Sequence, residues 1–420
     1  MVVCIPATGA LCNSGDIAWV ITATALVMIM TPGLGFFYGG LVRRKNLVST
    51  IVQCMAIFGV VSLAWAIWGY TLAFGGSSLD GFIGNFQYFA LNGVGSSANT
   101  AYSSTIPALL YFAFQLKFAA ITPALIIGAF AGRIRLKPLL IFILAWVTFI
   151  YFPVAHWIWG VDGWMRVMGV EDFAGGMVVH TTAGVSALAA ALVIGRGVDF
   201  GKESRPNNVP YVILGTAILW FGWFGFNAGS SLAADDVAIN ALVTTNLAAA
   251  AAGVSWMLLD WIRKGKPSAV GMCVGFVCGL AAVTPAAGFV SPAFAMVIGV
   301  GAGVGCNFVA SWRARTKLDD SLDVFACHGV GGMWGTVATG LFASVAINAA
   351  GQNGLVYGNV HFALLQMFAV AVVATFAFFG TYVILRVINY FSPLRTSAEE
   401  EKAGLDEVHF GEEAYYPTSE

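Results

Sequence analysis

Long apolar runs separated by short charged segments dominate the pattern of this chain. The stretches from Ile17 to Val42 and from Leu47 to Leu79 carry no charged residue. Each is longer than the roughly 20 residues that a helix needs to cross the hydrocarbon core of a bilayer. The pattern predicts eleven spans, over 17–42, 48–74, 105–132, 138–159, 173–195, 209–232, 238–261, 268–286, 291–312, 324–346 and 360–388.

Composition supports the membrane assignment. Hydrophobic residues make up 59% of the 420 residues and charged residues only 10%, whereas soluble domains carry about 25% charged residues. The 50 glycines suit membrane helices, in which small residues let backbones approach closely. We see no pattern of short alternating strands, and the net charge of −1 gives no sign of a nucleic-acid partner. The predicted class is an all-α polytopic membrane protein.

The basic residues predict the orientation. Eighteen of the 20 Lys and Arg residues fall on one side of the predicted spans, and the positive-inside rule makes that side cytoplasmic. An odd number of spans then places the N-terminus outside and the C-terminus inside. The cytoplasmic residues are Arg43, Arg44, Lys45, Arg133, Arg135, Lys137, Arg196, Lys202, Arg205, Arg263, Lys264, Lys266, Arg313, Arg315, Lys317, Arg386, Arg395 and Lys402.

The two ends of the chain differ in composition from the spans. Residues 1–16 are predicted to form an extracellular segment, in which Cys4 and Cys12 either form a disulfide or stay as free thiols. Residues 389–420 are predicted to form a cytoplasmic tail. Its acidic sequence SAEEEKAGLDEVHFGEEAYYPTSE is, by composition alone, typical of a disordered segment.

The spans divide into two halves. Five lie at 17–195, before the loop at 196–208, five lie at 209–346, and one more covers 360–388. Halves with an odd number of spans run in opposite directions, which predicts an inverted repeat with its working site near the membrane midplane. The fifth and tenth spans share a short pattern of His, two residues, a small residue and Gly, as HTTAG from His180 and HGVGG from His328.

The two histidines are predicted to meet inside the membrane. His180 follows Asp172 by eight residues from the outer side, roughly 12 Å at about 1.5 Å per residue, and His328 lies roughly 8–12 Å beyond Asp320 and Asp323 on the inner side. In a core roughly 30 Å thick, both rings reach similar depths. A single such histidine could equally be a hydrogen-bonded core residue, but two in antiparallel spans favour a substrate or proton path.

Two buried imidazoles allow a narrow range of chemistry. Burial disfavours the charged form, and two protonated rings would repel each other. The pair therefore suits a small, neutral, polar guest and suits a bare cation poorly, while imidazole can also pass protons. We find no metal-ligand cluster beyond the adjacent Cys327 and His328, no cofactor motif and no nucleophile–base set, so no metal, cofactor or enzymatic activity is predicted.

The sequence resembles the ammonium transporter (Amt/Rh) family, on its Amt branch, over nearly the whole length. The motifs that carry the resemblance are PGLGFFYGGLVRRKN at 32–46, FQLKFAAITPAL at 114–125, DFAGGMVVH at 172–180, GWFGFNAGS at 222–230, DVFACHGVGG at 323–332 and GLDEVHFGEEAY at 404–415. The resemblance implies eleven helices, a five-plus-five inverted repeat and a homotrimer with one pore per subunit. It also implies a multi-pass protein of the cell (plasma or inner) membrane.

The resemblance assigns roles to individual residues. His180 and His328 match twin pore histidines, and Phe118 and Phe226 match a stacked gate. The outer ammonium site would comprise Trp159, Phe118 and Ser230; an ammonium ion over an indole is a cation–π contact. Without the resemblance, Trp159 would be read as an interfacial residue and both phenylalanines as packing.

Three further residues are compared with the family pattern. Asp172 matches an aspartate near the outer end of the pore, where capping a helix start and aiding the ion are both plausible. Gln115 matches a polar position that the family links to proton passage. Lys117 departs from the family pattern, and at about 100° per residue it points away from Phe118.

The expected function is ammonium transport. Ammonium would bind at the outer vestibule, lose its proton and cross the gate and the histidine pair as ammonia, with net proton co-transport. A passive ammonia channel and an ammonium sensor without significant flux are the alternatives. Expected partners are ammonium or ammonia, methylammonium as a candidate analogue, the lipid bilayer, two further copies of the chain and a PII-type signalling protein as a candidate regulator.

Overall fold

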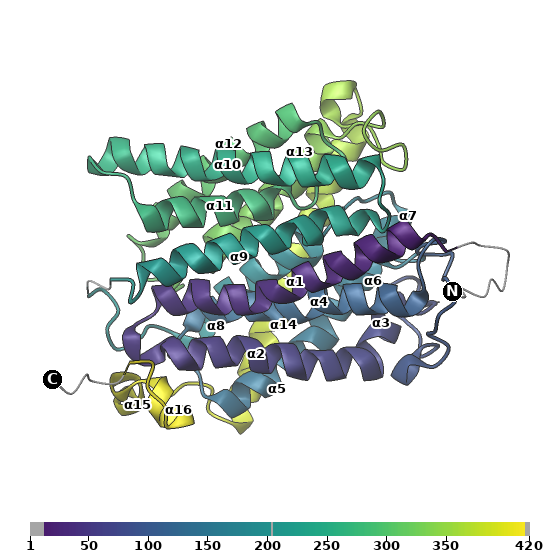
Figure 1. Ribbon diagram of the computed structural model, residues 1–420. Helices are drawn as coiled ribbons and strands as arrows, with labels where there is room; N and C mark the ends of the chain where they lie inside the picture. The colour runs from purple at the N-terminus through teal and green to yellow at the C-terminus, as the bar shows by residue number, and fades with distance from the viewer. Residues whose placement is uncertain (1–11, 203–204, 416–420) are drawn as a thin grey trace.

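Helices make up most of the structure, a computed structural model that describes residues 12–202 and 205–415. The long helices lie side by side and run in alternating directions (Figure 1). Among the described residues the only sheet is a two-stranded antiparallel ribbon of β1 (Ser77–Ser78) and β2 (Ile83–Gly84). The predicted N-terminal segment and its Cys4 fall largely outside the described residues.

The eleven predicted spans are confirmed, with ends that shift by a few residues. Nine helical segments of the described chain are long and apolar enough to cross a membrane; the other two are shorter. The spans are α1 (Ser14–Leu41); α2, η2 and α3 (Leu47–Ala64, Trp65–Gly69, Tyr70–Phe74); α4 and η4 (Ala108–Ile126, Ile127–Phe130); α5, η5 and α6 (Leu136–Trp146, Val147–Tyr151, Phe152–Trp159); η6 and α8 (Gly176–Thr181, Thr182–Ile194); α9 and η7 (Val209–Ala228, Gly229–Ser231); α10 (Asp236–Lys264); α11 (Ala269–Val283); α12 (Pro292–Arg313); η8 and α13 (Phe325–Val330, Gly331–Phe342); and α14 (Val360–Phe391).

Short elements fill the connections. They are η1 (Arg44–Asn46), η3 (Phe89–Leu91), α7 (Trp164–Val167), η9 (Leu355–Tyr357), α15 (Ala398–Ala403) and α16 (Leu405–Phe410). Most long helices begin at a side-chain cap, such as Asn13 for α1, Asn208 for α9 and Asp235 for α10. These side chains accept hydrogen bonds from N–H groups that the first helical turn leaves free, so polar residues help to set where these helices start.

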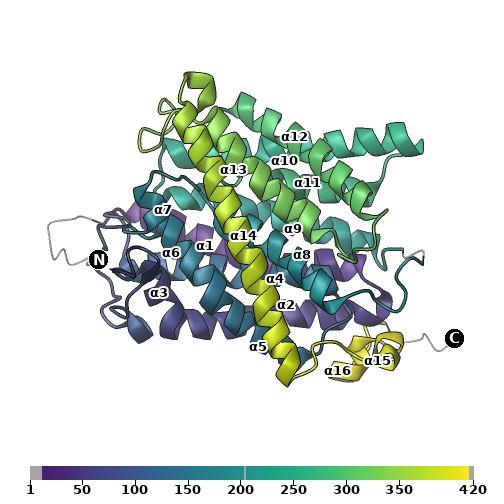
Figure 2. The same cartoon turned by 180° about the vertical axis from the view of Figure 1, so that it is seen from behind.

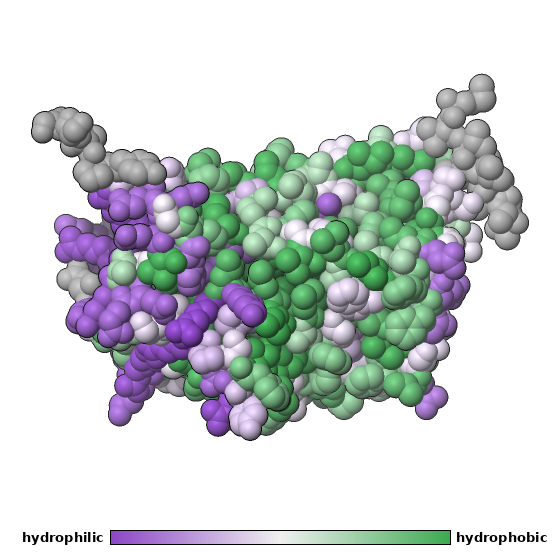
Figure 3. Space-filling model, turned by 90° about the horizontal axis from the view of Figure 1, so that it is seen from below, coloured by the Kyte–Doolittle hydropathy of each residue, from purple (hydrophilic) through white to green (hydrophobic). Residues whose placement is uncertain are grey.

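The fifth and tenth spans lie at the centre of the bundle. Helix α8 packs against η8, and α13 packs against η6. Helix α1 packs along α9, joining the two halves, and α14 runs diagonally across the back of the bundle over α8 (Figure 2). The outer surface is apolar in the middle: Figure 3 shows a broad hydrophobic band with hydrophilic residues at both ends, most densely at the end that carries the C-terminus. This is the surface of a multi-pass membrane protein.

The C-terminal tail is folded over its described part, against the expectation from its composition. Ser397 and Glu400 form a reciprocal capping box at the start of α15. Asp406 of α16 accepts hydrogen bonds from Val48 N and Ser49 N at the start of α2, at 3.0 and 2.7 Å. The tail carboxylates thus act as caps and partners for the cytoplasmic loops, which composition alone does not reveal.

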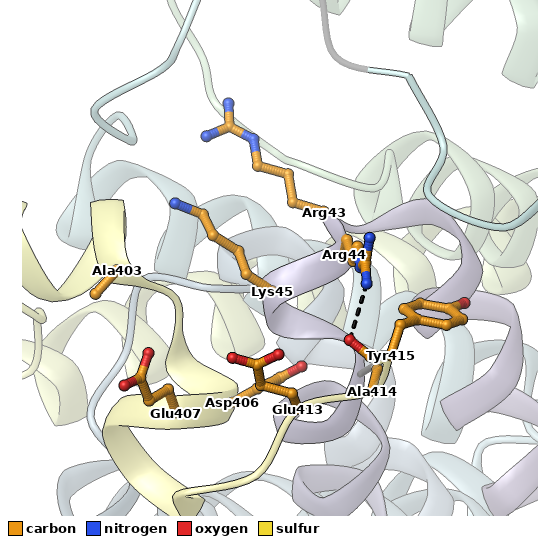
Figure 4. Close-up of a pocket in the computed structure, with 9 residues that line it drawn as sticks. All are labelled: Arg43, Arg44, Lys45, Ala403, Asp406, Glu407, Glu413, Ala414 and Tyr415. Carbon is orange, nitrogen blue, oxygen red and sulfur yellow. Dashed lines mark hydrogen bonds between the residues drawn. The ribbon is translucent and has the colours of Figure 1, made fainter. Parts of the chain in front are cut away.

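The docked tail encloses a cavity of about 400 Å³ beneath the first cytoplasmic loop. Figure 4 shows the carboxylates of Asp406, Glu407 and Glu413 on one side and Arg44 and Lys45 on the other. The Arg44 guanidinium lies 4.9 Å from the centre of the Tyr415 ring and donates a hydrogen bond to the backbone oxygen of Tyr415 at 2.8 Å (Figure 4). The hydrogen bond and the cation–π contact of Arg44 therefore help to hold the tail on this loop.

Candidate functional site

The two predicted histidines are in direct contact at the centre of the bundle. Nδ1 of His328 lies 3.3 Å from Nδ1 of His180, and the two rings stack at 5.2 Å with an angle of 23°. Both side chains are buried, with 1–2% exposed. One Nδ1 donates and the other accepts, so the two Nε2 atoms differ: one keeps a proton and the other keeps a lone pair. The pair thus presents one donor and one acceptor without a net charge.

Asp172 determines how the chain enters the fifth span. Its two carboxylate oxygens accept four backbone hydrogen bonds, from the N–H groups of Gly175, Gly176, Met177 and Val178, at 2.8, 2.6, 2.7 and 3.0 Å. This carboxylate caps the π-helical turn η6, which ends just after His180. A π turn rotates the following side chains relative to an α-helix and is frequent at functional sites. Asp172 therefore acts as the cap of η6.

The tenth span repeats this device. Asp320 precedes His328 by eight residues, as Asp172 precedes His180, and accepts hydrogen bonds from Val324 N and Phe325 N at 3.1 and 2.8 Å. The π-helical turn that follows, η8, carries His328. Sequence reasoning used Asp320 only to measure depth, although the equal spacing of the two Asp–His pairs was a visible signal for a second cap.

Glycines let the two histidine-bearing spans cross in close contact. A Cβ added at Gly184 would lie 1.9 Å from Gly329 N, and one added at Gly332 would lie 2.6 Å from Gly176 O and 2.8 Å from His180 Cβ. Gly184 and Gly332 are the last residues of the short pattern shared by the two halves. In each half, therefore, the glycine of the pattern lets the other histidine-bearing span come close enough for the two histidines to meet.

A small apolar cavity adjoins the histidine pair. It measures about 10 Å³ and is lined by apolar side chains apart from the two imidazoles, which is about the space of one water-sized molecule. Trp223 forms part of its wall and stacks on the His180 ring at 5.3 Å, while its Nε1 donates to Thr284 Oγ1 at 2.9 Å. Sequence analysis did not single out Trp223, because an apolar ring in a span has no distinguishing pattern.

The two predicted gate residues stack on each other above this cavity. The rings of Phe118 and Phe226 lie 4.3 Å apart at 38°, and Phe226 also faces His180 at 5.9 Å. Both phenylalanines are 1% exposed. The order from the outer end inward is therefore Phe118, Phe226, His180 and His328, and the two phenylalanine rings separate the outer side from the imidazoles.

Two adjoining cavities open on the outer side of the phenylalanines. The deeper one, of about 180 Å³, is lined by Gln115, Phe118, Trp159 and Ser230 among others. The wider one, of about 620 Å³, shares Trp159 and Ser230 with it. The structure thus brings the predicted outer-site residues together around one space.

Hydrogen bonds orient the polar groups of the deeper cavity. Trp159 Nε1 donates to the backbone oxygen of Asp172 at 2.8 Å, and the indole meets the Phe118 ring edge-on at 5.9 Å. Ser230 Oγ donates to Phe226 O at 2.8 Å, so its lone pairs remain free to accept. Gln115 Nε2 lies 3.4 Å from Tyr111 OH, and its buried Oε1 has no hydrogen-bond partner among the described residues. The cavity therefore offers acceptors to a cation.

Lys117 lies away from this path, as the helical spacing predicts. Its ammonium group sits 5.1 Å from the centre of the Phe58 ring on α2. A pair missed by sequence reasoning is the thiol contact between Cys278 and Cys327, whose Sγ atoms lie 3.2 Å apart next to His328.

Comparison with known proteins identifies the family of this chain. The sequence profile of the Ammonium Transporter Family matches residues 18–415. The chain belongs to this family. It is 45% identical over 403 residues to the "Ammonium transporter" of Bacillus subtilis (strain 168), covering 96% of this chain and 98% of that relative. It is 44% identical over 404 residues to "Ammonium transporter Amt1" of Archaeoglobus fulgidus, covering 96% and 100%.

Solved structures of family members share the fold. The crystal structure of Saccharomyces cerevisiae Mep2 is similar with a TM-score of 0.87 at 37% identity, covering 92% of this chain and 88% of that chain. A protein described as "Sensor Amt Protein" is similar with a TM-score of 0.86 at 30% identity, covering 94% and 98%. The same fold therefore occurs in Mep2 and in a protein described as a sensor.

Proposed function

We propose that this protein is an ammonium transporter that takes up ammonium at its outer cavity and conducts ammonia past the phenylalanine and histidine pairs. The observation that carries the proposal is the contact between His180 and His328 beside a cavity of about 10 Å³ with otherwise apolar walls. The names of the relatives at 44–45% identity agree with this substrate.

Ammonium binds in the outer cavity between the Trp159 indole, the Phe118 ring and the Ser230 hydroxyl. An ammonium ion against an aromatic face gains about 0.5–2 kcal/mol. The Ser230 oxygen accepts a hydrogen bond from one N–H of the ion, because the hydroxyl donates its own proton to Phe226 O. The unpaired Gln115 Oε1 accepts another.

The ion then loses a proton, because the apolar residues along the next part of the path do not stabilise its positive charge. A polar group buried without partners costs a few kcal/mol, whereas an isolated ion costs far more. Ammonia crosses the gate and is held by the Nε2 atoms of the histidine pair, one of which donates while the other accepts. The proton passes inward along a separate polar route beginning near Gln115, so that transport carries net charge, while Asp172 keeps η6 and Trp159 in position.

Currents on proteoliposomes test this proposal. Solid-supported-membrane recordings should give a current on ammonium pulses and none on potassium pulses. His328→Asn and His180→Ala should abolish this selectivity or the current, whereas His361→Asn, at an exposed position on α14, should change neither. Unaltered current and selectivity in both pore variants would contradict the role of the pair.

Two alternatives have distinct outcomes in the same assay. Ammonia flux without current would identify a passive ammonia channel. Methylammonium or ammonium binding without flux would identify a sensor, which is considered because one similar structure is described as a sensor.

The assembly and partners complete the proposal. We expect a homotrimer in the cell membrane, with a mass in solution three times the 44.2 kDa of one chain after correction for detergent. The docked tail and the basic loop above it form the surface on which a PII-type regulator would bind. Pull-down with the cognate regulator in each nucleotide state tests that partner, and no binding in any state would remove it.

A further inference from the structure

Glu171 is an ionisable residue of the outer cavity that the proposed mechanism does not use. It lines the wider cavity of about 620 Å³ together with Trp159 and Ser230. Its neighbour Asp172 has both carboxylate oxygens committed to the backbone of η6. The carboxyl of Glu171 differs from that of Asp172 in that its hydrogen bonds come from Gln352 and not from the start of a helix.

The backbone of Glu171 is fixed from both sides by one residue. Gln366 of α14 accepts from Glu171 N at 3.1 Å and donates to Glu171 O at 2.7 Å. The side chain lies beside the connection between α13 and η9, since a Cβ added at Gly351 would come within 3.3 Å of Glu171 Oε2. That Oε2 atom is buried and has no hydrogen-bond partner among the described residues. A fixed carboxyl with an unused oxygen is thus built into the wall of the cation-binding cavity.

We infer that Glu171 is a second cation-binding group of the outer cavity, and that its ionised form draws ammonium or a primary alkylammonium ion toward Trp159. The inference rests on the proposed function. Binding of the cation and loss of the Glu171 proton to the outer solution are linked, so each favours the other by the same factor. No covalent step is involved.

The groups around Glu171 affect how readily its carboxyl ionises. Arg166, Asp172 and Asp235 line the same cavity, and the nearest polar groups from the facing connection, Asn348 and Gln352, are neutral. Burial raises the pKa of Glu171 to about 8, although hydrogen bonds from Gln352 favour the ionised form. The carboxyl is therefore neutral at pH values well below 8 and becomes ionised above it, so the affinity for a cation rises with external pH.

Methylammonium uptake into proteoliposomes tests the inference. This ion is a weaker acid than ammonium and stays cationic over the range from about pH 6.5 to about pH 9, on both sides of the pKa of the carboxyl. We expect the wild-type KM to fall by about fivefold or more across this range, as for a typical coupling between two sites. Glu171→Gln, which resembles the neutral carboxyl, should keep the low-pH KM at all pH values. Equal KM values of the two proteins at low pH also establish that the variant is folded.

Asp235→Asn is the matched control. It removes a different carboxylate from the same cavity and should keep the pH dependence of KM. An identical pH profile for wild type and Glu171→Gln would overturn the inference while leaving ammonium transport intact. Absence of methylammonium and ammonium uptake in the wild type at every pH would overturn the proposed function, and this inference with it.

Discussion

Replacing Asp172 by Asn tests whether this residue acts through the backbone of η6. Asp172 accepts four buried hydrogen bonds through two oxygens. Asn keeps one oxygen and turns its amide toward the other two N–H groups, which lose their acceptor. Each unsatisfied buried donor costs about 1–3 kcal/mol, so the free energy of unfolding should fall by about 2–6 kcal/mol.

The assay is unfolding of the detergent-solubilised protein, followed by tryptophan fluorescence, beside two comparison variants. Asp320→Asn leaves one N–H unpaired, that of Val324 or Phe325, and should lose about 1–3 kcal/mol. Asp235→Asn should be nearly neutral, because both hydrogen bonds use Oδ1, which Asn retains, and Asn caps helices as well as Asp does. The expected order of destabilisation is therefore Asp172, Asp320, Asp235.

The reasoning is refuted if Asp172→Asn unfolds like Asp235→Asn. If Asp172→Asn is as stable as wild type but transports nothing, the carboxylate acts on the substrate and not through the backbone. Destabilisation in the expected order, with residual transport by the folded fraction, supports the capping role.

Three other changes give separate expectations. Asp406→Ala removes the cap that the tail provides for α2 and should cost about 0.5–2 kcal/mol, seen as faster hydrogen exchange in α16; unchanged exchange would argue against docking through this contact. Gly184→Ala places a Cβ 1.9 Å from Gly329 N and should prevent a monodisperse, active protein, whereas Gly59→Ala, with nothing within 4 Å, should behave like wild type. Ser230→Ala removes one acceptor and should raise the KM for ammonium by about two- to tenfold with a smaller effect on kcat; an unchanged KM would exclude Ser230 from the site.

The spans could be predicted because the bilayer imposes one strong rule on the sequence. A backbone in hydrocarbon must satisfy its own hydrogen bonds, so each crossing becomes a long apolar helix with polar punctuation. The tail does not obey that rule. Its acidic residues resemble a solvated segment until Asp406 is seen to cap α2 and Glu401 to accept from Val198 N and pair with Arg395. The partners Val48 and Val198 lie hundreds of residues away from the tail and leave no local pattern.

The histidine pair could be predicted for a related reason. Ionisable residues inside spans are rare, and the spacing from the nearest charges estimates their depth. The π turns, the stacking of Trp223 and the contact of Cys278 with Cys327 depend on how two spans cross. Local sequence does not determine that crossing, which the absence of a side chain at Gly184 and Gly332 permits.

The internal repeat makes the two histidine-bearing spans similar, but the cavities at the outer and inner ends of the protein differ. At the outer end, Trp159 and Ser230 face a cavity whose charged lining consists of Arg166, Glu171, Asp172 and Asp235. At the inner end, a cavity of about 660 Å³ is lined by more basic than acidic side chains, namely Arg43, Arg133, Lys202 and Arg313 against Asp199, Asp319 and Glu401.

This difference in charge bears on the direction of uptake. A cation gains from the acceptors and the indole on the outer side, whereas on the inner side guanidinium groups such as Arg133 repel it and their carboxylate partners, such as Asp319 at 2.8 Å, are already engaged. Under the proposed function, in which only neutral ammonia reaches the histidine pair, selectivity for an incoming cation arises in the outer cavity. The repeated motif therefore accounts for the two facing imidazoles, and residues outside it account for the difference in charge between the outer and inner cavities.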